Sequence, residues 1–96
     1  MTKYKLPIKY DETHWTIRRE VRNQYIEEQD GMCQFCSNDL YDQPQEDINN
    51  LYINERLFPP NFFKYPVHLH HCRKTGYTIG AVHAQCNAVM WQYLGE

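Results

Sequence analysis

The stretch VHLHHCRKTGYTIGAVHAQCNAVMWQYL, residues 67–94, decides the fold of this 96-residue chain. The pattern predicts a strand over residues 67–72, a turn over 73–76 and a returning strand over 77–82. Gly76 supplies the permissive backbone that such a turn requires. Residues 84–94 have helical character. The order strand, turn, strand, helix predicts a small α+β domain.

Length indicates one domain over residues 1–96. Its segments read as a basic arm over 1–10, a helix over 11–30, a tight turn over 31–36, an irregular acidic and aromatic insert over 37–66, and the core over 67–94. Asp11 or Thr13 can cap the leading helix, and Gly31 stands where a helix stop is expected. A short helix is expected over residues 48–57 of the insert.

Two ligand pairs share one spacing, Cys33-x-x-Cys36 and His83-x-x-Cys86. Thiolates and imidazole at such spacing are typical of tetrahedral structural zinc sites. A domain this small buries too little surface to be stable without a disulfide or a bound metal, and the expected reducing compartment favours the metal. Cys72 could replace His83 as fourth ligand, although a buried strand residue is expected there. The alternative is a set of buried cysteines with a surface histidine and no metal.

The compartment follows from what the sequence lacks. No apolar run approaches the ~18 residues of a membrane span, and the first ten residues show no apolar core of a signal peptide. We therefore expect a cytoplasmic protein with no membrane partner, whose thiols stay reduced. In such a compartment a C-x-x-C pair indicates metal ligation or a redox motif, and the lack of a βαβ pattern favours metal.

Charge is distributed unevenly behind a net value of −2, which excludes a histone-like basic binder. From Glu27 to Glu55 there are eight acidic residues and no lysine or arginine, whereas the rest of the chain holds ten basic and four acidic residues. Three arginines of the expected helix share an arc without an acid three or four residues away. Phosphate contact, a solvated face and pairing with the acidic middle all remain open for them. A DNA-binding surface that tracks phosphates could be formed by Arg18, Arg19, Arg22, Arg73 and Lys74, with Lys64 and the arm lysines Lys3, Lys5 and Lys9 beside them.

Three histidines occur within four residues of the first expected strand, at His68, His70 and His71. Alternation along a strand places His68 and His70 on one face and His71 on the other. Because imidazole titrates near neutrality, one histidine can act as a base while its neighbour binds a metal.

The run from His68 to Gly76, followed by Gly80 and then His83-x-x-Cys86-Asn87, resembles the HNH endonucleases. The likeness is to the zinc-knuckle type that includes phage Holliday-junction-resolving nucleases, and it covers about residues 31–94. It implies a ββα-metal (His-Me finger) motif that grips a divalent ion, with a leading helix before the knuckle. It also suggests a chain encoded by a phage or mobile element and acting inside the host cell.

Carried over by position, the resemblance implies that His71 is the general base, that His70 binds the catalytic metal where many relatives have Asp, and that Asn87 is the second ligand or orients the site. Ile79 stands where many relatives have Arg, so one phosphate contact is missing. Mg²⁺ or Mn²⁺ is expected at this site, and a histidine ligand also suits Ni²⁺ or Co²⁺. The resemblance assigns structural zinc to Cys33, Cys36, His83 and Cys86.

The resulting hypothesis is a metal-dependent DNA endonuclease or nickase, an endodeoxyribonuclease that hydrolyses phosphodiester bonds with one catalytic metal and a histidine base. The alternative is a catalytically inactive zinc module that binds DNA or a protein. A third reading is a protein-binding adaptor built on the insert. Residues 39–66 could also supply the surface of a homodimer or a protein partner.

Overall fold

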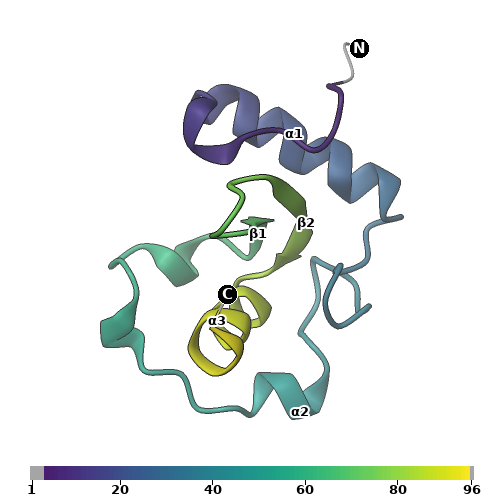
Figure 1. Cartoon of the computed structure of the whole chain (residues 1–96). Helices are drawn as coiled ribbons and strands as arrows, with labels where there is room; N and C mark the ends of the chain where they lie inside the picture. Colours follow the sequence, from purple (N-terminus) through teal and green to yellow (C-terminus); the bar gives the residue numbers. More distant parts are fainter. Residues whose placement is uncertain (1–3, 96) are drawn as a thin grey trace.

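A computed structural model describes residues 4–95 of the chain, so the expected role of Lys3 lies outside the described residues. The fold is a small α+β arrangement around one two-stranded antiparallel sheet (Figure 1). No helix among the described residues is long and apolar enough to cross a membrane. The elements in chain order are η1 (Tyr10–Glu12), α1 (Trp15–Glu28), α2 (Glu46–Asn49), η2 (Glu55–Leu57), η3 (Phe62–Lys64), β1 (Val67–His71), β2 (Thr78–His83) and α3 (Ala84–Leu94).

The hairpin of β1 and β2 confirms the strand prediction: the first strand begins at Val67 as predicted, and the other three boundaries are displaced by one residue. Val67 pairs with His83, and His70 pairs with Gly80. The register then shifts between His70 and His71, which makes a local bulge. The turn is closed by Gly76, whose φ is 79°. α3 follows β2 directly and has the bounds that the sequence predicts.

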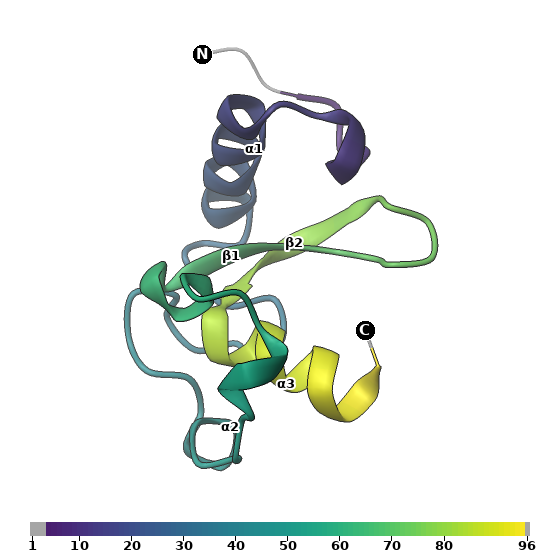
Figure 2. The ribbon, with the colours of Figure 1, turned by 90° about the vertical axis from the view of Figure 1, so that its left-hand side faces the viewer.

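The two long helices lie on opposite sides of the hairpin (Figures 1 and 2). α1 packs against both strands, and α3 packs against both strands from the other side. α2 lies beyond α3 and contacts it. The hairpin is therefore the middle layer, and the acidic α2 is separated from α1 by the sheet and α3.

α1 begins later than predicted, so the expected helix over 11–30 is wrong at its start. Residues 10–12 form the separate turn η1, which is closed by a 3.3 Å hydrogen bond from the Thr13 amide to the Tyr10 carbonyl. The cap of α1 is His14, whose ring nitrogen accepts from the Thr16 amide at 3.3 Å. Gly31, with φ 75°, lies past the end of α1 as expected.

The basic arm is fastened to the hairpin. The Thr78 amide donates to the Ile8 carbonyl at 2.9 Å, and the Ile8 amide donates to the Thr78 hydroxyl at 3.1 Å. The Tyr10 amide then donates to the Gly76 carbonyl at 2.8 Å. These bonds place the Tyr10 ring beside the end of β1.

The insert over residues 37–66 is largely irregular, as predicted, but the expected helix over 48–57 is wrong. α2 ends at Asn49, and only a short 3₁₀ turn, η2, follows. Hydrogen bonds to side chains of α3 hold this segment instead. The Asn54 amide donates to Gln92 at 2.9 Å, and the Tyr93 hydroxyl donates to the Tyr52 carbonyl at 2.6 Å.

Candidate metal centre and histidine cleft

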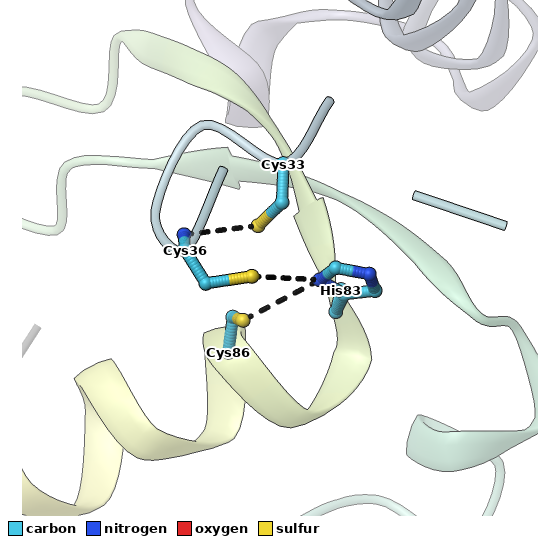
Figure 3. A group of neighbouring side chains, drawn as sticks. All are labelled: Cys33, Cys36, His83 and Cys86. Carbon is cyan, nitrogen blue, oxygen red and sulfur yellow. Dashed lines mark hydrogen bonds between the residues drawn. The ribbon is translucent and has the colours of Figure 1, made fainter. Parts of the chain in front are cut away.

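Four buried side chains meet where the knuckle, the end of β2 and the start of α3 come together (Figure 3). One ligand atom from each lies within 4.8 Å of all the others. The four residues are those of the two sequence pairs, so His83 rather than Cys72 completes the set. The group consists of Cys33, Cys36, His83 and Cys86.

The donor atoms face one another. His83 Nδ1 lies 3.4 Å from the Cys36 sulfur and 3.5 Å from the Cys86 sulfur. The other ring nitrogen, Nε2, lies 2.8 Å from the Asp39 carbonyl oxygen, which can only accept. Nε2 therefore carries the proton, and the Nδ1 lone pair faces the sulfurs, as in metal-bound histidines. Three thiols and one imidazole in this arrangement can hold a structural metal such as zinc.

The electrostatics of the cluster favour a cation. A hydrogen bond from the Cys86 thiol lowers the pKa of Cys33 to about 4. The same bond, with burial, raises the pKa of Cys86 above its usual range. Backbone amides of Phe35 and Cys36 also point at the Cys33 sulfur, at 3.4 Å and 3.5 Å. These hydrogen bonds favour the ionised form of the Cys33 thiol, which is the form that binds a metal.

A cleft of about 820 Å³ runs along β1, and all five residues of that strand line it. It lies between α1, the segment around η3, and α3. The cleft brings together most of the remaining site residues that the sequence predicts, while Lys74 does not line it. The predicted residues in its lining are His70, His71, Asn87, Arg18, Arg19, Arg22 and Arg73.

His68 is the residue that sequence reasoning left without a role. Its Nε2 lies 2.8 Å from the Phe62 carbonyl oxygen, so Nε2 carries the proton and Nδ1 accepts. The side-chain nitrogen of Asn87 lies 3.1 Å from that Nδ1 and donates to it. Burial lowers the pKa of His68, which favours this neutral form. The only sequence signal for a role of His68 in the site is its spacing of two residues from His70, which predicts that both lie on one face of the strand.

His71 follows the register shift in β1 and contacts the arm rather than α3. Its ring stacks on Tyr10 with centroids 4.0 Å apart and planes 9° from parallel. The Arg18 guanidinium covers the same tyrosine ring at 4.1 Å, and its Nε donates to the Tyr10 carbonyl at 2.8 Å. Burial lowers the pKa of His71. His70, between the two other histidines, is only 3% exposed.

Positive charge predominates in the lining of the cleft, although Asp11 lies near enough to act electrostatically on His71. Its walls carry four arginines and no aspartate or glutamate. Within residues 4–95 no carboxylate forms a salt bridge with these arginines, and the acidic α2 lies on the far side of α3 (Figure 1). The acids of α2 are therefore not the partners of the α1 arginines.

Comparison with protein-family models, curated proteins and solved structures finds no match.

Proposed function

We propose that this chain is a metal-dependent DNA endonuclease or nickase of the HNH type. The observation that carries the proposal is the cleft that joins three histidines and Asn87 to four arginines and contains no acid. Phosphodiester hydrolysis needs a proton acceptor for water and positive charge around the phosphate. The lining of the cleft offers both kinds of group within one space.

The surrounding chain supports a ββα-metal motif. β1, β2 and α3 follow one another without interruption, and His71 and Asn87 come from the first strand and the helix. Asn87 directly follows Cys86, one of the four clustered ligands. A metal in that cluster would therefore fix the start of α3 and, with it, the position of the Asn87 carboxamide.

His71 is suited to take a proton from the attacking water. Burial keeps its pKa below the ordinary value, so the ring is neutral at physiological pH and has a free lone pair. The parallel Tyr10 ring restricts the rotation of the imidazole. The four arginines would hold the phosphates on either side of the reacting one.

His70 and Asn87 are the residues that would hold the catalytic ion. The Asn87 amide nitrogen is directed at His68, so its oxygen remains for an ion, and imidazole nitrogen is a ligand for the same divalent metals. When bound, a divalent ion would withdraw charge from the scissile phosphate and the leaving oxygen. Mg²⁺ and Mn²⁺ suit an oxygen ligand, and Ni²⁺ or Co²⁺ suits the imidazole.

Incubation with supercoiled plasmid in each of these four metals tests the proposal. We expect nicked or linear product from the wild-type protein and none from His71→Ala, with unchanged zinc content and circular dichroism. His14→Asn, purified in the same way, is the matched control because His14 lies outside the cleft lining and Asn also caps helices well. Equal cleavage by His71→Ala would refute the role of the base. DNA binding without cleavage in any metal would support the inactive zinc module instead.

A further inference from the structure

Large aromatic side chains are exposed on the walls of the cleft. Trp15 is 61% exposed, Tyr65 is 56% exposed and Trp91 is 38% exposed, and all three line the cleft. These two tryptophans are the only ones in the sequence. Tryptophan is usually well covered in a folded domain, so two uncovered rings in one basic cleft indicate a ligand with a flat apolar face.

Each ring is accompanied by a cation. The Arg19 guanidinium lies 5.5 Å from the Trp15 ring, and that of Arg73 lies 4.9 Å from the Trp91 ring. A ring paired with a guanidinium can stack on a base while the cation contacts the adjacent phosphate. The cleft repeats this pair at two places.

The two pairs stand on different walls. Trp15 begins α1 and Trp91 lies in α3, and these helices flank the hairpin on opposite sides (Figure 2). β1, with its histidines, lies between them and lines the cleft along its whole length. A nucleic-acid chain bound along β1 would therefore contact one aromatic ring on each side of the proposed reacting phosphate.

Duplex DNA cannot use such rings without distortion, because its base faces are covered by neighbouring base pairs and only edges and phosphates are accessible. Unpaired bases can stack on aromatic side chains, in contacts that tolerate any sequence. A protein partner would need acidic groups to meet four arginines, and would leave the repeated ring–cation pairs without a specific purpose. Single-stranded nucleic acid satisfies both the charge and the rings.

We propose that the cleft binds single-stranded DNA, with unpaired bases stacked on Trp15 and Trp91 and the phosphates on the neighbouring arginines. This inference rests on the proposed function for the chemistry that follows binding. Binding itself does not depend on cleavage, so it can be tested alone.

The test uses the zinc-loaded full chain without added catalytic metal. Anisotropy of a fluorescein-labelled 12-nucleotide strand is compared with that of the same strand in a duplex. We expect at least about tenfold tighter binding of the single strand and quenching of tryptophan fluorescence. Trp15→Ala should weaken single-strand binding by about 5- to 150-fold, the range for losing one stacked base. Trp15→Phe should retain most of it.

Tyr41→Ala is the matched control, since Tyr41 is 72% exposed but lies outside the cleft lining. Equal or tighter binding of the duplex would overturn the inference, as would equal losses for Trp15→Ala on both ligands. Cleavage of duplex plasmid together with no preference for single strands would leave the proposed nuclease standing and remove only this inference. Selective single-strand binding without cleavage would do the reverse.

Discussion

Asn87 donates its side-chain amide to Nδ1 of His68 at 3.1 Å, which joins the first turn of α3 to β1. The opposite nitrogen of that ring is held by the Phe62 carbonyl at 2.8 Å. A backbone oxygen of the insert thus selects the tautomer of a strand histidine, and the histidine selects the orientation of the helix carboxamide. The Asn87 oxygen is left facing away from His68.

This relation predicts that His68 acts on metal binding through Asn87. His68→Ala should raise the Mg²⁺ concentration for half-maximal cleavage by about 10- to 100-fold, the usual loss when a residue supporting a metal ligand is removed. His68→Gln supplies both an acceptor and a donor and should recover part of the affinity. Cleavage rates titrated with Mg²⁺ give the result. An unchanged midpoint in His68→Ala would contradict the positioning role.

The stack of Tyr10 on His71 predicts a separate effect on turnover. An aromatic pair contributes about 0.5–1.5 kcal/mol beyond its buried area, so Tyr10→Ala should lower kcat by about 2- to 13-fold. The KM for DNA should change less, because the Tyr10 ring is already covered by His71 and Arg18 and is not offered to a base. Tyr10→Phe keeps the ring and should behave like wild type. Equal losses in the two variants would show that the hydroxyl, not the stack, matters.

Zinc removal should unfold the protein. The small buried core is built around the cysteines of the cluster, together with Leu40, Val67, Ala81, Val82 and Met90. Structural zinc contributes about 10–16 kcal/mol in small domains, against a typical stability of about 5–15 kcal/mol. We expect one zinc per chain by elemental analysis and loss of the circular-dichroism signal with a chelator. Cys33→Ser should lose zinc, whereas Cys72→Ser should retain it. A chain that stays folded without metal would rule out this role.

Gly80 predicts a stability effect away from the cleft. The Gln29 side chain bonds both backbone groups of Ala81, at 2.9 Å and 3.0 Å. A Cβ at position 80 would lie 2.8 Å from the Gln29 oxygen and 2.9 Å from a Gln34 carbon. Gly80→Ala should therefore cost about 1–3 kcal/mol, or about 4–8 °C in Tm for each kcal/mol. Thermal unfolding measures it, with the half-exposed Ile79→Ala as control.

The salt dependence of DNA affinity should show how many arginines of the cleft contact phosphates. For single-stranded DNA each neutralised phosphate contributes about −0.7 to the slope of log K against log salt, so four contacts predict about −3. Arg22→Gln should reduce the magnitude of the slope by about 0.7. Arg56→Gln, in η2 and outside the cleft lining, should leave it unchanged. A flat wild-type response would mean that the cleft is not used by DNA.

Local patterns allowed much of the fold to be predicted. The hairpin, α3 and the four clustered ligands follow from spacing within residues 31–94, because each pair of ligands lies on one turn. The cap of α1 could not be foreseen. Asp11 and Thr13 are stronger capping residues than His14 in general, but here they belong to a segment that the hairpin holds in η1.

Contacts between segments that are far apart in the chain could not be predicted from the sequence. His68 depends on a backbone carbonyl of the insert, and His71 depends on a tyrosine of the arm. Neither partner is indicated by a periodic pattern, because each is brought in by irregular chain. The nuclease assignment stays a prediction from the quoted motif and the lining of the cleft.

The adjacency of Cys86 and Asn87 has a consequence for how this protein would be inactivated. Because the small core is built around the cluster, oxidation of its thiols, or loss of their ion to a competing chelator, would unfold the domain and separate the carboxamide from His68. One peptide bond joins Cys86, a ligand of the structural cluster, to Asn87, a residue of the proposed catalytic site. Oxidation of the cluster would then inactivate the protein without chemically modifying any histidine of the cleft.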